Sequence, residues 1–126
     1  MALWLAVAIG GAAGTLLRHG VNTLFATLLE RPVPYATAAV NLIGSGVIGL
    51  LAGAIAAGRL PMSASMRGFV FVGVLGGFTT FSSYMLDTLT LAYSGEPGLA
   101  LLNVTLQTLL GLAAIWAGYA LAIGLN

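Results

Sequence analysis

Four long apolar segments, separated by short connections, constrain the fold of this chain more than any other feature of its sequence. They cover residues 2–29, 34–57, 68–93 and 97–124. A helix that crosses a bilayer needs about 20 predominantly apolar residues, and each segment is long enough. Only 6% of the residues are charged, against about 25% in a typical soluble domain. The sequence therefore predicts one all-α integral membrane domain of four transmembrane helices, spanning residues 1–126.

Composition excludes several classes of function. The chain has no cysteine and no lysine, and its four basic residues other than histidine are arginines, so it offers no basic patch for nucleic acid. It also shows no pairing of nucleophile and base, no metal-ligand cluster and no cofactor loop, and we therefore predict that it is not an enzyme. The first segment lacks a preceding basic stretch, which favours a retained helix over a cleaved signal peptide.

The third segment carries an interruption near its middle. Residues 73–84 read Gly-Val-Leu-Gly-Gly-Phe-Thr-Thr-Phe-Ser-Ser-Tyr. Glycine is about 1 kcal/mol less favourable than alanine in a helix, so the pair Gly76 and Gly77 favours a break near the membrane midplane. Backbone groups released there need protein, water or an ion as partners, because lipid supplies none. Broken helices at this depth are typical of binding sites and permeation pathways.

Polar side chains inside the other segments form a candidate polar track. Asn41 lies within the second segment, and Asn103 and Gln107 lie one helical turn apart in the fourth, with Thr108 beside them. Polar residues in a membrane helix face protein or water rather than lipid. They either form hydrogen bonds between helices or offer N–H and O–H donors to a passing anion, and both interpretations stay open.

Two aromatic residues follow the interruption. Phe81 and Tyr84 are three positions apart and therefore share a helix face. Packing is the usual role of such a pair, but the edge of an aromatic ring carries positive potential and can face an anion. Asp87 comes three residues later, nearer the helix end, where it is either a solvated end residue or a functional group. We regard it, with Arg18, as a candidate vestibule residue.

Small residues recur every four positions in the first two segments. The first row is Ala6, Gly10 and Gly14, and the second follows Asn41 with Ser45, Gly49, Gly53 and Ala57. This spacing lets helix backbones approach closely. Packing within one chain explains either row, but two such rows in one short chain favour a homo-oligomer.

The arginines give no clear orientation. Four spans place Arg59 and Arg67 on the side of the N-terminus, and Arg31 and Arg18 are assigned to the other side. Positive charge usually collects on the cytoplasmic side. Either another feature sets the orientation, or the chain inserts both ways and pairs with an inverted copy.

Three motifs together give the chain a family resemblance. They are Gly10-Gly11-Ala12-Ala13-Gly14 followed by Arg18, then Val40-Asn41-Leu42-Ile43-Gly44, and then Gly76-Gly77-Phe78-Thr79-Thr80-Phe81-Ser82. Over essentially its whole length the chain resembles the Fluc family of small bacterial fluoride channels, also called the CrcB family. The third motif is the most specific of the three.

The resemblance implies an antiparallel, dual-topology homodimer in the bacterial inner membrane, with two fluoride pores along the dimer interface. It implies a structural sodium ion held by backbone carbonyls, here those of Gly76 and Thr79. The implied pore residues are Asn41, Phe81, Thr80, Ser82, Tyr84, Asn103, Gln107 and Thr108. Position 84 departs from the family pattern, which usually has phenylalanine there. The tyrosine hydroxyl can bind fluoride, crowd the pore or change its rate.

A fluoride pore has to replace the water around a small, strongly hydrated anion with other donors. The resemblance further implies passive export that lowers cytoplasmic fluoride and confers fluoride resistance. Two alternatives stay open. A small multidrug-type antiporter needs an embedded carboxylate, for which Asp87 is the one candidate, and a structural membrane subunit would use the polar residues for packing alone.

Overall fold

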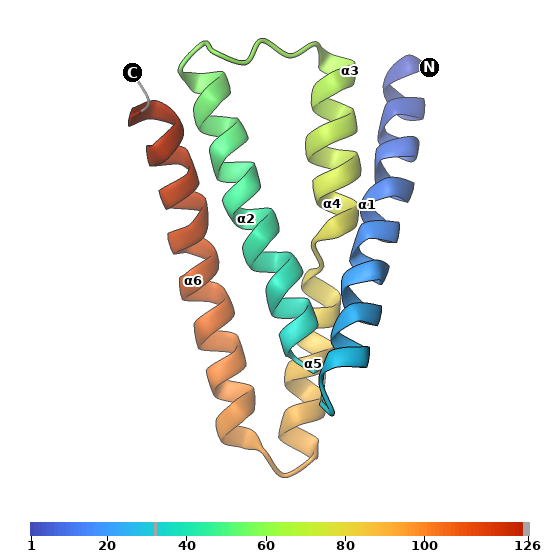
Figure 1. The fold of residues 1–126 in the computed structure, drawn as a ribbon, viewed down its shortest axis with the longest axis vertical. Helices are drawn as coiled ribbons and strands as arrows, with labels where there is room; N and C mark the ends of the chain where they lie inside the picture. Colours follow the sequence, from blue (N-terminus) through green and yellow to red (C-terminus); the bar gives the residue numbers. More distant parts are fainter. Residues whose placement is uncertain (32, 125–126) are drawn as a thin grey trace.

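The structure is a computed structural model that describes residues 1–31 and 33–124 (Figure 1). Within those residues, four helical segments are long and apolar enough to cross a membrane. Three are single helices: α1 (Ala2–Leu28), α2 (Tyr35–Ala56) and α6 (Pro97–Gly124). The other segment, Ala64–Tyr93, is divided into shorter pieces. The predicted all-α fold with four transmembrane helices is therefore confirmed.

The divided third span consists of α3 (Ala64–Arg67), the π-helical η1 (Gly68–Leu75), α4 (Gly76–Phe78) and α5 (Phe81–Tyr93). It begins before the predicted residue 68, because the Ser63 side chain accepts a hydrogen bond from the Met66 N–H at 3.2 Å and caps a helix that starts at Ala64. The predicted break is present between α4 and α5, about halfway along the molecule (Figure 1).

The termini and loops alternate between the two ends of the bundle. The start of α1, the end of α6 and the connection from α2 to α3 lie at one end, while the connections from α1 to α2 and from α5 to α6 lie at the other (Figure 1). At the first end, Arg59 donates hydrogen bonds to the carbonyls of Ala122 and Ile123 in the last turn of α6. At the second, Arg31 and Glu96 form an ion pair at 2.9 Å that joins the two connections.

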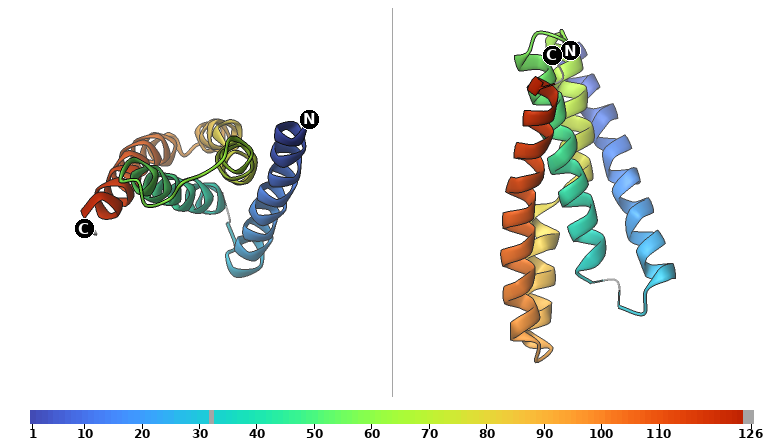
Figure 2. Two further views of the ribbon diagram at one scale, coloured as in Figure 1. Left: turned by 90° about the horizontal axis from the view of Figure 1, so that it is seen from above. Right: turned by 60° about the vertical axis from the view of Figure 1, so that its left-hand side comes forward.

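The third span changes its packing partner at the break. Its first half, η1 and α4, packs against α1, whereas α5 packs against α6, which also lies along α2. Figures 1 and 2 show the consequence, with α1 standing at one edge of the bundle and α6 at the other. The break is therefore the point at which one chain segment passes from one helix pair to the other.

Glycine permits both close helix pairs. A side chain added at Gly14 would meet the backbone of Val74 and Phe78, and one added at Gly49 would meet the backbone of Ile115. The rows of small residues thus pack within the chain. The third span and α6 occupy both rows, so the rows are explained by packing within one chain, and the homo-oligomer stays a prediction.

The interior of this fold contains several polar side chains, and many large apolar side chains lie on its outside. Buried side chains include Thr80, Asn103 and Gln107, and Val40 alone among the described large side chains is fully buried. Trp4 and Trp116 and many leucines are exposed instead. This arrangement suits a bilayer, in which apolar side chains face lipid and polar ones need partners inside the protein.

Candidate functional site

The break in the third span consists of two extended residues. Thr79 has φ −83° and ψ 160°, and Thr80 has φ −154° and ψ 120°. Gly76 and Gly77, where the sequence favoured the break, remain helical in α4. The threonines are better suited to the extended conformation because β-branched side chains favour it, and Gly77 is instead required for its close approach to the backbone of Gly11.

Asn41 on α2 holds the break open. Its Oδ1 accepts the Thr80 N–H at 2.8 Å, and its Nδ2 donates to the Thr80 carbonyl at 3.1 Å. One side-chain amide therefore satisfies both backbone groups of an extended residue. Gly44, one turn further along α2, leaves room for the Thr79 methyl group against the helix.

Thr80 also begins the next helix. Its Oγ1 accepts the backbone N–H of Ser83 at 3.2 Å and lies 3.1 Å from the Ser83 hydroxyl and 3.4 Å from that of Ser82. Threonine is a favoured N-cap residue because its hydroxyl replaces a missing helical acceptor. The three hydroxyl groups therefore gather at the first turn of α5.

These hydrogen bonds release two backbone carbonyls. In a continuous helix the Gly76 carbonyl would accept the N–H of Thr80, and the Thr79 carbonyl would accept that of Ser83. Both N–H groups bond elsewhere, to Asn41 and to the Thr80 hydroxyl. Gly76 and Thr79, the two residues that the family resemblance assigned to a cation, thus have carbonyls without their helical partners.

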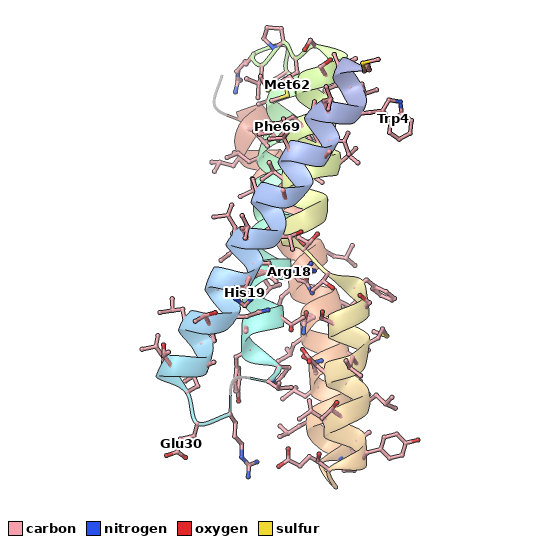
Figure 3. The ribbon with its side chains drawn as sticks, turned by 90° about the vertical axis from the view of Figure 1, so that its right-hand side faces the viewer. Trp4, Arg18, His19, Glu30, Met62 and Phe69 are labelled. Atoms are coloured by element: carbon pink, nitrogen blue, oxygen red, sulfur yellow. The ribbon has the colours of Figure 1, made fainter. Side chains whose placement is uncertain are left out.

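Arg18 lies beside one of the released carbonyls. Its Nη1 is 3.4 Å from the Thr79 oxygen, and Figure 3 shows its side chain at the level of the break. The sequence assigned Arg18 to the end of the bundle that holds Arg31, which was wrong because the side chain lies inside the span. The arginines therefore number two at one end, one at the other and one in between.

A chain of side-chain amides runs from Asn41 into α6. The second Asn41 N–H donates to Gln107 Oε1 at 3.0 Å, and Gln107 Nε2 donates to Asn103 Oδ1 at 2.7 Å. Asn103 Nδ2 donates to the Thr88 hydroxyl at 2.9 Å, which donates to the Tyr84 carbonyl at 2.8 Å. Asn103 and Gln107 are 6% and 8% exposed, so the structure places them inside the chain between α2, α5 and α6.

Phe81 and Tyr84 contact each other edge to face. Their ring centroids are 5.8 Å apart and the ring planes meet at 68°. Phe81 is 73% exposed, whereas Tyr84 is 7% exposed. The Tyr84 hydroxyl donates to the Val104 carbonyl at 3.0 Å and lies 3.1 Å from the Thr108 hydroxyl. The tyrosine that departs from the family pattern is therefore anchored to α6 through its hydroxyl.

The break lines an open cavity of about 330 Å³. Of the residues that the sequence singled out, it brings together Asn41, Gly76, Thr79, Thr80, Phe81 and Tyr84. Ser82, Thr108, Arg18 and Asp87 do not line this cavity. Asn103 and Gln107 line a second cavity, of about 300 Å³, whose rim includes Arg31 and Glu96.

Sequence reasoning missed Ser45 and Phe71 as lining residues of the first cavity. Ser45 follows Asn41 by one helical turn, so their shared face on α2 was a usable signal. Phe71 had no such signal because its placement depends on how η1 packs.

Asp87 has an unsatisfied oxygen. Its Oδ2 is buried and has no hydrogen-bond partner among the described residues. Arg18 bonds the Thr79 carbonyl, and no contact between Arg18 and Asp87 joins the two candidate vestibule residues within the part of the chain that the structure describes.

An interrupted membrane helix with a cavity at the break is typical of membrane proteins that bind or transport ions or small solutes. Comparison with known proteins narrows this class. The family model of the CrcB-like protein, Camphor Resistance (CrcB), matches residues 5–119. The chain belongs to this CrcB family, as its three motifs predicted, and is a multi-pass protein of the bacterial inner membrane.

Similar proteins match the chain over nearly its whole length. A protein of Opitutus terrae is 44% identical over 127 residues, covering 100% of this chain and 96% of the relative. One from Aeromonas salmonicida is 43% identical, covering 94% of each chain, and one from Agrobacterium fabrum is 43% identical, covering 95% and 94%. Each is named "Fluoride-specific ion channel FluC". These names describe channels, in agreement with the prediction that the chain is not an enzyme.

Proposed function

We propose that this chain forms a fluoride-selective channel through which fluoride leaves the cell passively, so that cytoplasmic fluoride falls. The observation that carries the proposal is similarity along the whole chain to proteins named as fluoride-specific channels. The cavity at the break of the third span supports it independently, because hydroxyl groups lie in it or beside it at membrane depth.

The cavity has the chemistry that a small anion needs. Hydroxyl groups of Ser45, Thr80 and Ser82 lie in it or beside it, and the Phe81 and Tyr84 rings lie along its wall. Hydroxyl donors and ring edges together replace part of the hydration shell of fluoride. In our proposal chloride is excluded by its larger size, because a narrow path admits only the smaller anion.

Both N–H groups of Asn41 are engaged inside the chain, by Thr80 and by Gln107. In our proposal Asn41 therefore acts on the pore by holding the extended residues that form its wall. The Tyr84 hydroxyl is likewise engaged by α6, so the Tyr84 ring edge, rather than its hydroxyl, faces the anion.

We further propose that two inverted copies assemble around the break, with a pore along each side of their interface. In a single copy the cavity is open, Phe81 is 73% exposed and the released carbonyls lie along the cavity. The Thr79 carbonyl keeps one hydrogen bond from Arg18, but a backbone carbonyl left without any partner costs several kcal/mol in lipid. An inverted second copy covers this surface by placing break against break, and the weak arginine asymmetry favours insertion in both orientations.

The carbonyls of Gly76 and Thr79 fit a structural sodium ion, because both have lost their helical N–H partners and carry no charge. Two copies supply four such oxygens around one point on their axis. A bound cation contributes fixed positive charge between the two pores. Among the described residues, Arg18 is the one charged group bonded to either carbonyl. In a single copy its guanidinium donates a hydrogen bond to the Thr79 oxygen.

Two other functions give different results in one assay. A multidrug-type antiporter would couple transport to protons through Asp87, and a structural subunit would carry no anion. Purified protein in liposomes, followed with fluoride and chloride electrodes in parallel, separates all three. We expect fast fluoride loss with chloride retained, at a rate that does not depend on a proton gradient. Under a proton gradient, we expect Asp87→Asn to lose fluoride at the same rate as the wild-type protein.

Phe81→Ala tests whether the cavity carries the flux. The Phe81 ring is exposed on α5, so its loss removes a cavity wall with little effect on the fold of one copy. Tyr93→Ala is the matched control, because Tyr93 is an 84% exposed aromatic residue of the same helix away from the cavity. Fluoride retention by correctly assembled wild-type protein would overturn the channel proposal.

A further inference from the structure

We propose that Gln107 is a positioning residue of the pore, which acts through Asn41 on the extended Thr79–Thr80 segment. The expected effect on fluoride flux rests on the proposed channel function. The role of Gln107 in orienting Asn41 does not depend on that function. Gln107 belongs to α6, Asn41 to α2 and Thr80 to the third span, so the relation joins three of the four spans.

The hydrogen-bonding capacity of the Asn41 amide N–H groups is fully used. Its oxygen accepts from the Thr80 N–H, one amide N–H goes to the Thr80 carbonyl and the other goes to Gln107 Oε1. A rotated amide would turn its oxygen toward two acceptors, the Thr80 carbonyl and Gln107 Oε1. The acceptor presented by Gln107 therefore helps to select the orientation in which Asn41 fits Thr80.

The direction of the whole amide chain is set by its two ends. A backbone N–H can only donate, so Asn41 must present oxygen to Thr80. A backbone carbonyl can only accept, so the Thr88 hydroxyl donates its hydrogen to the Tyr84 carbonyl and accepts from Asn103. Asn103 then presents its oxygen to Gln107, whose own oxygen is left for Asn41.

Burial strengthens this arrangement. Gln107 and Asn103 are 8% and 6% exposed, and hydrogen bonds in such surroundings are stronger while unpaired groups are more costly. The sequence grouped both residues with the pore lining. In the structure neither residue lines the cavity at the break. Both line the second cavity, and Gln107 is bonded to Asn41, which suits a support for the pore wall.

Gln107→Met tests the relay in the reconstituted dimer. Methionine has a similar length but cannot accept the Asn41 N–H. We expect fluoride flux to fall by about tenfold, which corresponds to about 1.4 kcal/mol in the barrier, because the pore wall is no longer held by Asn41. Thr105→Val is the control, because Thr105 is an exposed residue of α6 that bonds only the Leu101 carbonyl of its own helix.

A double-mutant cycle separates action through Asn41 from a general effect of α6. If Gln107 acts through Asn41, Gln107→Met should change flux little once Asn41→Ala is present, because the amide that it orients is gone. Flux losses that multiply in the double variant would overturn the proposal.

Gln107→Glu tests the relay through the pH dependence of fluoride flux, which would not change if Gln107 only packed against its neighbours. A protonated glutamic acid donates to Asn103 and accepts from Asn41, whereas the ionised form has no donor. We therefore expect flux near the wild-type level where the glutamic acid is protonated, and a lower flux once a rise in pH ionises it. A flat ratio to wild type across pH would contradict the relay.

The titratable groups around position 107 are the same in Gln107→Glu and in the wild-type protein. They are Arg31, Tyr35 and Glu96 around the cavity that Gln107 lines, with Tyr84 and Asp87 on α5. Dividing each variant rate by the wild-type rate at the same pH removes their contribution.

Amide hydrogen exchange at Thr80 tests the relay without any flux. We expect Gln107→Met to speed exchange of the Thr80 N–H, because Asn41 is no longer held as its acceptor, while Thr105→Val leaves it unchanged. Unchanged Thr80 exchange in Gln107→Met would refute the relay even in a conducting protein. Faster Thr80 exchange in Gln107→Met, together with fluoride retention by the wild-type protein, would refute the channel and keep the relay.

Discussion

The side-chain amide of Asn41 pairs with both backbone groups of Thr80, at 2.8 Å and 3.1 Å. These two residues are 39 positions apart and belong to different spans. Inside a bilayer this pairing replaces the hydrogen bonds that the broken helix gives up. It allows an extended segment to persist at membrane depth and thereby creates the candidate pore wall.

Asn41→Ala should disrupt both the fold and the flux. The substitution leaves a buried N–H and carbonyl of Thr80 without partners, each at a cost of about 1–3 kcal/mol. We expect a lower unfolding temperature in detergent and a large loss of fluoride efflux from liposomes. Asn22→Ala is the control, since Asn22 is an exposed asparagine of α1. A variant with wild-type stability and flux would show that the pairing is not needed.

Tyr84→Phe should separate anchoring from permeation. It removes the hydroxyl that bonds the Val104 carbonyl and Thr108 but keeps the ring. We expect the free energy of unfolding to fall by about 0.5–1.5 kcal/mol, while fluoride flux stays within a few-fold of wild type. Tyr93→Phe, at an exposed position, should change neither quantity. Complete loss of flux in Tyr84→Phe would mean that the hydroxyl itself serves the anion.

Gly14→Ala should weaken the contact between α1 and the third span. An added methyl group meets the Val74 and Phe78 backbone, and overpacking of this kind costs about 1–3 kcal/mol. Gly20→Ala on the same helix meets nothing within 4 Å and should be neutral or stabilising, because alanine favours a helix by about 1 kcal/mol. Thermal unfolding of both variants measures the difference. Equal stability would place α1 further from the third span than it lies in this structure.

Removal of sodium should weaken the proposed assembly. In the proposed assembly the cation would bind four carbonyls from two copies, so replacing sodium with a bulky organic cation would leave those oxygens facing one another. We expect more monomer by cross-linking and slower fluoride efflux, with helix content unchanged by circular dichroism. Identical dimer content and efflux in both salts would remove the structural sodium from the proposal.

Local properties of the sequence determined the four spans, the interrupted third helix and the family. Apolar length and scarcity of charge require helices in a bilayer, and the motifs around Asn41 and Phe81 identify the family without any tertiary contact. The short connections also implied which ends of the helices lie together. These features depend on residues close to one another in the chain.

Tertiary contacts decided how the site is built. The break falls at Thr79 and Thr80 rather than at Gly76 and Gly77, because Asn41 supplies hydrogen bonds there while the glycines are taken up by packing against α1. Tertiary packing likewise decides that Gln107 bonds Asn41 and that Arg18 bonds the Thr79 carbonyl. Each depends on a partner from another span, and the sequence shows which groups need a partner without showing which partner they find.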